Sequence, residues 1–283
     1  MKFVHHVSAR HFLETAEGWL LRNEAEHNLL LGLAHARAQD VPPDEPPAFF
    51  ATIQEGDRVR GCLFRTPPYK LGLTRMPEVA LPLAVQGVAT VYDTLPGVIG
   101  PPETIRAFAD VWAGRMEVEV TPGMEMGIHA LEEVTLPAHP APGRMRLAAE
   151  DDEPLLAEWG RRFVEDTGVA LPDPEGRTRA LLQERALHTW DDGGRVVSMA
   201  AALAPTPRGI RIGYVYTPPE HRRRGYASTL VARLSQLLLD GGRSFCFLYT
   251  DLSNPTSNRI YHEIGYRRVA EAGELNFVES PRP

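Results

Sequence analysis

The sequence predicts a mixed α/β fold, and the second half of the chain indicates it most clearly. Strand-like apolar runs at 186–190, 196–203 and 210–216 are separated by turn sequences at 191–194 and 206–209. A set of apolar residues then repeats at helical spacing: Leu230, Val231, Leu234, Leu237 and Leu238. Strands joined by short turns, followed by helices and strands in alternation, predict a mostly antiparallel sheet flanked by helices.

The remaining elements of this half fit the same plan. Helices are predicted at 151–167, where Leu156 and Trp159 share one face, and at 175–186. A short helix is expected between Asn254, a good N-cap that is followed by a proline, and a glycine stop at position 265. Three short strands complete the half, the last two as a closing pair: 244–250, 266–270 and 275–278.

The first half repeats this order of elements in a fainter form. A helical region is expected from Ser8 to about position 38, followed by strand-like runs at 49–54, 58–65 and 80–91. The segment VIGPPE (98–103) then matches VYTPPE (215–220), and each leads from an apolar run into a helix. We therefore expect the fold to be present twice.

A proline-rich segment near the midpoint separates the halves. Residues 137–143 read PAHPAPG, a composition that disfavours helix and strand and suits a stiff linker. We accordingly predict a degenerate first domain at 1–136, the linker at 137–143 and a complete second domain at 144–283.

Composition excludes several classes of function. The net charge of −7 argues against a general nucleic-acid binder, which would normally be basic. The two cysteines, Cys62 and Cys246, lie in apolar runs without zinc-binding spacing, and the pair His5-His6 has no further ligands, so no metal site is expected. No apolar run approaches the roughly 18 residues of a membrane span. A soluble cytoplasmic protein is predicted.

A run of three arginines marks the predicted binding site. Arg222, Arg223 and Arg224 follow a strand-like run and lead into Gly225 and a helical pattern. The start of a helix offers unpaired N–H groups and the positive end of the helix dipole, which together favour an anion. Glycine lets a bulky phosphate approach the backbone closely. This order of elements therefore predicts a pyrophosphate-binding loop, although it lacks the Gly-x-Gly-x-x-Gly pattern of a dinucleotide fold.

This loop and a later segment resemble a known family. Residues 222–227 fit the pattern Arg/Gln-x-x-Gly-x-Gly/Ala, and NPTSNRIYHEIGY follows at 254–266. Together they resemble the cofactor-binding motifs of the GNAT superfamily of N-acetyltransferases, and the resemblance covers about 145–278. It implies a GNAT-like sheet, acetyl-CoA as co-substrate, and a bulged strand before the loop that separates from its neighbour.

The resemblance also implies which residues bind coenzyme A. Backbone N–H groups of the loop would hold the pyrophosphate, and the strand before it would pair with the pantetheine arm. The expected set is Val215, Tyr216, Thr217, Arg222, Arg223, Arg224, Gly225, Tyr226, Ala227 and Ser228, joined by Asn254 and Ser257. Asn254 has a competing role as a helix N-cap, and Tyr226 fits packing better than chemistry.

Tyr261 is the predicted general acid. It shares one helix face with Asn254 and Ser257, at spacings of three and seven residues. Members of this family place a tyrosine here toward the sulfur, where its hydroxyl can donate to the departing thiolate. The general base stays open among Glu220, His221, Asp251, His188 and a water chain.

The resulting hypothesis is an acetyl-CoA-dependent N-acetyltransferase in which an amine of a small molecule or peptide attacks the thioester directly. No cysteine lies near the motifs to act as a nucleophile. The anion-binding loop occurs only in the second half, so we expect one cofactor per chain. The alternative is a non-catalytic acyl-CoA-binding or protein-interaction module that retains the fold. The acceptor and the oligomeric state stay open.

Overall fold

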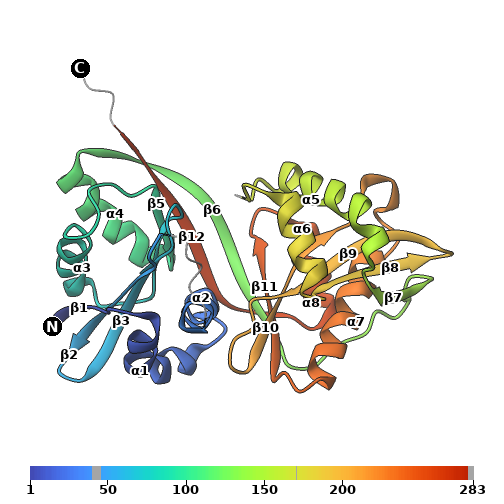
Figure 1. Ribbon diagram of the computed structural model, residues 1–283, viewed down its shortest axis with the longest axis horizontal. Coiled ribbons are helices and arrows are strands. Elements are labelled where there is room, and N and C mark those ends of the chain that lie inside the picture. Colours follow the sequence, from blue (N-terminus) through green and yellow to red (C-terminus); the bar gives the residue numbers. More distant parts are fainter. Residues whose placement is uncertain (40–45, 170, 280–283) are drawn as a thin grey trace. The chain divides into compact units, whose positions relative to one another are not determined.

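The computed structural model describes residues 1–39, 46–169 and 171–279, and its contacts divide the chain into two compact units. The first unit comprises Met1–Ile128, Thr250–Ser253 and the chain from Arg268 onward, and the second comprises His129–Tyr249 and Asn254–Arg267 (Figure 1). The units are therefore not continuous in sequence, because the end of the chain belongs with its beginning.

The first unit is built on a sheet whose strands run in the order β1-β2-β3-β4-β5-β12-β6. Neighbours are antiparallel from β1 to β4, β4 and β5 are parallel, and β12 pairs antiparallel with β5 through Gly273 and Gly100. The strands are β1 (Lys2–His5), β2 (Phe49–Glu55), β3 (Arg58–Arg65), β4 (Leu71–Leu73), β5 (Gly97–Gly100), β6 (Val118–Leu131) and β12 (Arg267–Glu279).

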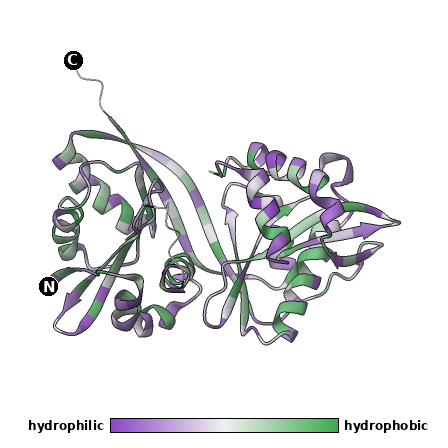
Figure 2. Ribbon diagram, viewed as in Figure 1, coloured by the Kyte–Doolittle hydropathy of each residue, from purple (hydrophilic) through white to green (hydrophobic). Residues whose placement is uncertain are grey.

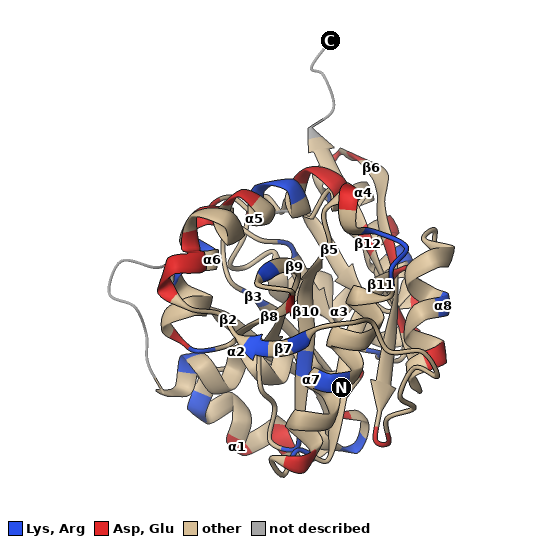
Figure 3. Cartoon of the chain, turned by 90° about the vertical axis from the view of Figure 1, so that its right-hand side faces the viewer, with Lys and Arg blue, Asp and Glu red and all other residues tan. Residues whose placement is uncertain are grey.

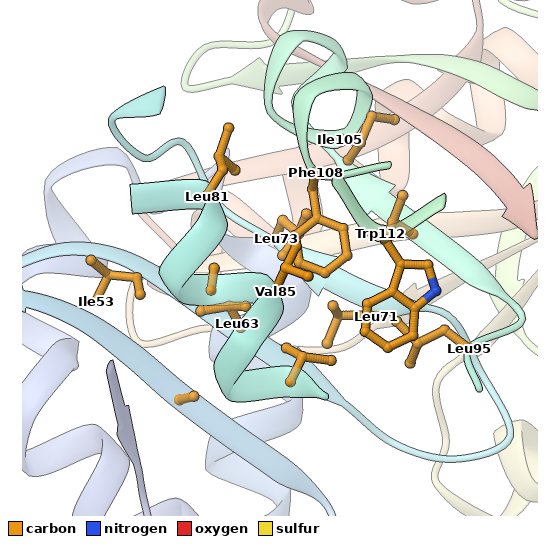
Figure 4. Close-up of a cluster of buried hydrophobic side chains, with 14 of the residues drawn as sticks. Ile53, Leu63, Leu71, Leu73, Leu81, Val85, Leu95, Ile105, Phe108 and Trp112 are labelled. Atoms are coloured by element: carbon orange, nitrogen blue, oxygen red, sulfur yellow. The ribbon is translucent and has the colours of Figure 1, made fainter. Parts of the chain in front are cut away.

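Helices cover both faces of this sheet. They are α1 (Ala9–Leu20), α2 (Asn28–Gln39), α3 (Leu81–Val88) and α4 (Pro102–Met116). On β2, Ile53 packs with Leu81 of α3 and Phe108 of α4, whereas the alternate residue Phe50 packs with Phe12 of α1. Figure 4 shows the first of these clusters, in which Trp112 and Phe108 lie among aliphatic side chains from the strands. The period-2 alternation of a strand thus places apolar residues on both faces.

The second unit repeats the arrangement. Its strands are β7 (Arg144–Leu147), β8 (Leu187–Asp192), β9 (Arg195–Leu203), β10 (Gly209–Tyr216) and β11 (Phe245–Asp251), ordered β11-β10-β9-β8-β7 across the sheet. Pairing is antiparallel except between β10 and β11, which are parallel. The helices are α5 (Glu153–Thr167), α6 (Pro174–Gln183), α7 (Tyr226–Asp240) and α8 (Pro255–Ile264). In each unit hydrophobic residues gather on the strands and on the helix faces that cover them (Figure 2).

Two buried clusters of the second unit are used below. The α7 cluster includes Ile210, Ile212, Leu230 and Tyr226, with Tyr261 of α8 packed against it. The α5 cluster includes Trp159 and Leu181 together with residues from the end of β10.

The predicted mixed, mostly antiparallel fold is confirmed, and its order of elements occurs twice. Each unit has an antiparallel meander followed by a parallel pair of strands joined by a crossover helix. This crossover is β4–α3–β5 in the first unit and β10–α7–β11 in the second. The segment 137–143 contains neither helix nor strand, and its role as a domain boundary stays a prediction.

Two local predictions are wrong. Residues 80–91 form helix α3 instead of a strand, because the buried residues Leu81, Ala84, Val85 and Val88 recur at helical spacing within a run too short to decide the period. The predicted closing pair at 266–270 and 275–278 is one continuous strand, β12. The helical region predicted from Ser8 to about position 38 is confirmed: it consists of two helices, with a short 3-10 turn at Leu21–Asn23 after the first.

The match between VIGPPE and VYTPPE is also wrong. VIGPPE joins β5 to α4, the helix that follows the parallel pair, whereas VYTPPE leads into α7, the crossover helix inside the pair. The segment equivalent to VYTPPE in the first unit lies at 74–80, between β4 and α3. The duplication therefore does not depend on the two proline pairs.

Candidate functional site

Strand β10 contains a β-bulge near its end. Gly213 pairs with Ala201 of β9, but the next pair joins Tyr216 to Met199, so three steps on one strand match two on the other. Tyr214 lies in the left-handed region with φ of 55°. Ile210 and Ile212 belong to the α7 cluster, whereas Tyr214 and Tyr216 belong to the α5 cluster. The bulge thus reverses which face the even-numbered residues occupy.

Contacts of Tyr214 hold the bulge in place. Its hydroxyl donates to the carbonyl oxygen of Pro174 at 3.1 Å and lies 2.9 Å from the hydroxyl of Thr178. A Cβ at Gly160 would lie 2.1 Å from the same hydroxyl, so the glycine makes room for it. Burial raises the pKa of Tyr214, which keeps this donor protonated.

The two parallel strands β10 and β11 separate before the bulge. The ladder between β10 and β11 runs from Gly209 with Phe245 to Arg211 with Phe247, while β10 continues to Tyr216. In this part of the chain, the end of β10 therefore keeps backbone groups that β11 does not pair. Such an edge can bind an extended amide-containing arm by main-chain hydrogen bonds.

The loop after β10 leads into α7, and the start of this helix has no side-chain cap among the described residues. Gly225 is the N-cap of α7 with φ of 79°, a conformation that favours glycine, and no side chain caps the helix. The first helical hydrogen bond runs from the N–H of Thr229 to the carbonyl of Gly225. The N–H groups of Tyr226, Ala227 and Ser228 consequently have no partner within the helix.

The three arginines of the loop differ in their surroundings. Arg222 donates to the carbonyl of Thr217 at 2.9 Å and to the carboxylate of Asp166 at 2.5 Å. Asp166 belongs to α5, whose acidic residues are marked in Figure 3. Arg224 interacts with the hydroxyl of Tyr226. Arg223 is exposed, has φ of 64° and has no partner among the residues that the structure describes. It is thus the unpaired cation of the loop.

The other predicted loop residues mostly support the backbone. Tyr226 is buried in the α7 cluster and donates to Asp192 at 2.5 Å, as its assignment to packing requires. Val215 packs against the α7 cluster. The hydroxyl of Thr217 lies 2.8 Å from that of Ser198, and the hydroxyl of Ser228 donates to the carbonyl of Gly225 at 3.0 Å.

Helix α8 carries the remaining predicted residues. The side-chain oxygen of Asn254 accepts from the N–H of Ser257 at 3.1 Å, so Asn254 does serve as the N-cap. Ser257 is half-buried. Tyr261 lies on the same helix, which packs against α7, the helix that starts at the loop. The structure therefore brings the loop and these three residues into one unit.

Tyr261 is half-buried, and its ring meets the edge of Tyr266 with 6.0 Å between centroids. Burial raises the pKa of Tyr261 to about 12. Its hydroxyl has no hydrogen-bond partner among the described residues, a state that suits a donor whose acceptor arrives with the substrate.

The four candidate bases have distinct environments. Asp251 accepts from the N–H and hydroxyl of Ser253, at 2.8 and 2.7 Å, and so stabilises a turn. Burial lowers the pKa of the half-buried His188, and Glu220 is exposed in the loop. His221 lies edge-on to Tyr226, and its Nδ1 is covered without a partner. These contacts do not single out a base.

Sequence reasoning missed two residues of this region. Tyr214 gives no signal of the bulge, because tyrosine is an ordinary strand residue. Arg211, in contrast, is visible in the sequence, because it is a charged residue inside the apolar run of β10. Within the described ranges, no group of three or more potential ligands could hold a metal ion. No helix there is long and apolar enough to cross a membrane.

Comparisons with known proteins agree with this geometry. A family model described as "FR47-like protein" matches residues 192–273, which include the loop and α8. Human N-acetyltransferase 8 is 29% identical over 102 residues, covering 34% of this chain and 45% of that relative, so less than half of the relative is matched.

Solved structures extend the likeness to the whole chain. A Drosophila protein aligns with a TM-score of 0.68 and 14% identity, covering 97% of this chain and 98% of the other. A tandem GNAT protein from the clavulanic acid biosynthesis pathway aligns with a TM-score of 0.56 and 12% identity, covering 100% and 99%. At these identities the likeness concerns the fold alone.

Proposed function

We propose that this chain is an N-acetyltransferase of the GNAT superfamily and transfers an acetyl group from acetyl-CoA to an amine acceptor. The observation that carries the proposal is the uncapped start of α7 at Gly225, directly after the bulged end of β10. The second unit combines these features with Tyr261 on the neighbouring helix.

The start of α7 fits a pyrophosphate. Free N–H groups of Tyr226, Ala227 and Ser228, together with the helix dipole, favour negative charge at this point. Arg223 adds a cation that no carboxylate neutralises among the described residues. The unpaired edge of β10 from Ile212 to Tyr216 would bind the pantetheine arm. Acetyl-CoA, when bound, supplies an activated thioester to the acceptor amine.

In this proposal Tyr261 donates a hydrogen bond to the departing sulfur. A thiol has a pKa of about 8.5, whereas burial raises the pKa of Tyr261 to about 12. Complete proton transfer from the tyrosine to the thiolate would therefore be uphill by about 5 kcal/mol. Stabilising the developing negative charge by a hydrogen bond has no such cost, so this is the form of acid catalysis that the environment favours.

Two measurements on the wild-type protein test the proposal. Calorimetric titration should detect coenzyme A binding, and release of free thiol should accelerate when acetyl-CoA is supplied with an amine from a panel of acceptors. Absence of coenzyme A binding would refute the cofactor assignment. Tight binding without turnover on any class of amine would instead favour the non-catalytic acyl-CoA-binding module.

A further inference from the structure

Arg211 is a half-buried cation that the proposed chemistry does not use. It lies on β10 between Ile210 and Ile212, which both face the α7 cluster. Because strand residues alternate, its side chain projects to the opposite face of the sheet, the one covered by α5 and α6. The residue is half-buried, but its Nε is fully covered and has no hydrogen-bond partner among the described residues.

The charges around Arg211 do not neutralise it. Tyr249 of β11 and Arg177 of α6 are the groups that act on it electrostatically, and neither is a carboxylate. Arg177 has its own counter-ion, because its Nη1 lies 3.7 Å from Glu184. Burial lowers the pKa of Arg211, as expected for a cation removed from water.

Covering part of a guanidinium without giving it an anion is costly, and proteins usually pair such a group. The position of Arg211 indicates which ligand would supply the anion. Its pairing with Phe247 is the last step of the β10–β11 ladder, so Arg211 marks the point where the strands separate. The proposed pantetheine site starts at the next residue of the same strand. An anion at Arg211 would thus be adjacent to the reacting end of that arm, on the face away from α7.

We propose that Arg211 binds the carboxylate of the acceptor, and that the acceptor is therefore an amine that also carries a carboxylate, as amino acids do. The inference rests on the proposed function and narrows its acceptor class. The planar guanidinium suits a carboxylate because two parallel N–H groups can bind its two oxygens.

The test compares reaction products that differ only in charge. Protein saturated with coenzyme A is titrated with N-acetylated amino acids and with the corresponding amides, for example N-acetylglycine against N-acetylglycinamide, over a panel of side chains and chain lengths. We expect at least one carboxylate to bind about 10- to 100-fold tighter than its amide. Arg211→Met should remove that preference while leaving coenzyme A affinity unchanged. Arg179→Met, an exposed arginine of α6 paired with Glu153, should retain it.

Each outcome decides the inference. Equal binding of acid and amide throughout the panel, or an unchanged preference in Arg211→Met, would overturn it. A stronger preference for N-acetylated phosphoethanolamine would replace the carboxylate by a phosphate and so also overturn it. If Arg211→Met does not fold, Arg211→Lys retains the charge without the planar fork and should keep only part of the preference. Coenzyme A binding without any preference would refute this inference alone, whereas absent coenzyme A binding would refute the proposed function.

Discussion

The two crossover connections of this chain share a topology and differ in chemistry. In the second unit, β10 leads to α7 through an uncapped Gly225 and the unpaired cation Arg223. In the first unit, the equivalent segment at 74–80 joins β4 to α3 and has no glycine. Glu78 lies in the first turn there, where its charge opposes an anion.

In the segment 74–80 of the first unit, Arg75 and Thr74 make contacts that stabilise the fold. Arg75 is paired with both Glu26 and Glu103, so its charge is neutralised. The hydroxyl of Thr74 accepts from the N–H of Cys62 at 2.8 Å and fixes the segment to β3. Under the proposed function, the comparison teaches that the fold supplies the geometry of an anion site, whereas a few loop residues decide whether that site can bind.

Changing the N-cap glycine should have the largest effect. Gly225→Glu forces a left-handed conformation on a residue with a side chain and places negative charge at the proposed anion site. We expect coenzyme A affinity to fall by at least about 10³-fold in calorimetry. The matched change in the first unit, Glu78→Lys, should leave affinity unaltered. A gain in coenzyme A affinity in Glu78→Lys would mean that the first connection also binds the cofactor.

Removing the predicted donor should lower turnover without affecting binding. Tyr261→Phe should reduce kcat by about 10²-fold, with coenzyme A affinity nearly unchanged. Because the pKa of Tyr261 is raised to about 12, the hydroxyl stays protonated, and kcat should show no decline attributable to this group up to about pH 10. An unaltered kcat in the variant would assign Tyr261 to packing alone.

Acid should destabilise the first unit through His6. Its side chain is 4% exposed, its Nδ1 has no partner among the described residues, and burial lowers its pKa from 6.5 to about 4. The unfolded chain therefore binds a proton first as the pH falls below 6.5, and stability is lost progressively toward pH 4. By pH 5 this amounts to about 2 kcal/mol.

Urea unfolding at pH 7 and pH 5 measures the stability that is lost through His6. His6→Gln should lose less stability between the two values than the wild type, while His139→Gln, at an exposed histidine of the second unit, should behave like the wild type. Equal acid sensitivity of His6→Gln and the wild type would show that another group is responsible.

The smallest effect distinguishes the arginines within the loop. Arg223→Met removes the unpaired cation and should weaken coenzyme A binding by about 5- to 20-fold, most strongly at low salt. Arg222→Met should weaken binding less, because that guanidinium is already bound to Asp166 and Thr217. It should instead cost less than about 1 kcal/mol of stability, as expected for an exposed ion pair. The reverse order of affinities would identify Arg222 as the phosphate ligand.

Sequence reasoning predicted the elements with local signals and missed those that depend on distant contacts. The N-cap role of Asn254 and the glycine at 225 could be read directly from residue type and spacing. The α3 helix was missed because its apolar run fits two periods. The bulge at Tyr214 could not be predicted, since it depends on a hydroxyl contact with a helix forty residues earlier.

The sequence predicts how many charged residues the candidate site contains, but not which of them are paired. Three adjacent arginines are visible in the sequence, yet only the structure distinguishes the paired Arg222 from Arg223. The same holds for Arg211, which has no counter-ion among the residues that the structure describes, because Tyr249 of β11 and Arg177 of α6 lie around it.

Strand β12, near the end of the sequence, completes the sheet of the first unit. It pairs with β5, and Phe277 stacks on Trp112 with 6.3 Å between ring centroids. During synthesis the N-terminal segments emerge first, but one edge of β5 stays open until β12 leaves the ribosome. An open edge is prone to pairing with other chains, and contacts across such a sequence separation form slowly. The first unit to be made is therefore the last that can be completed.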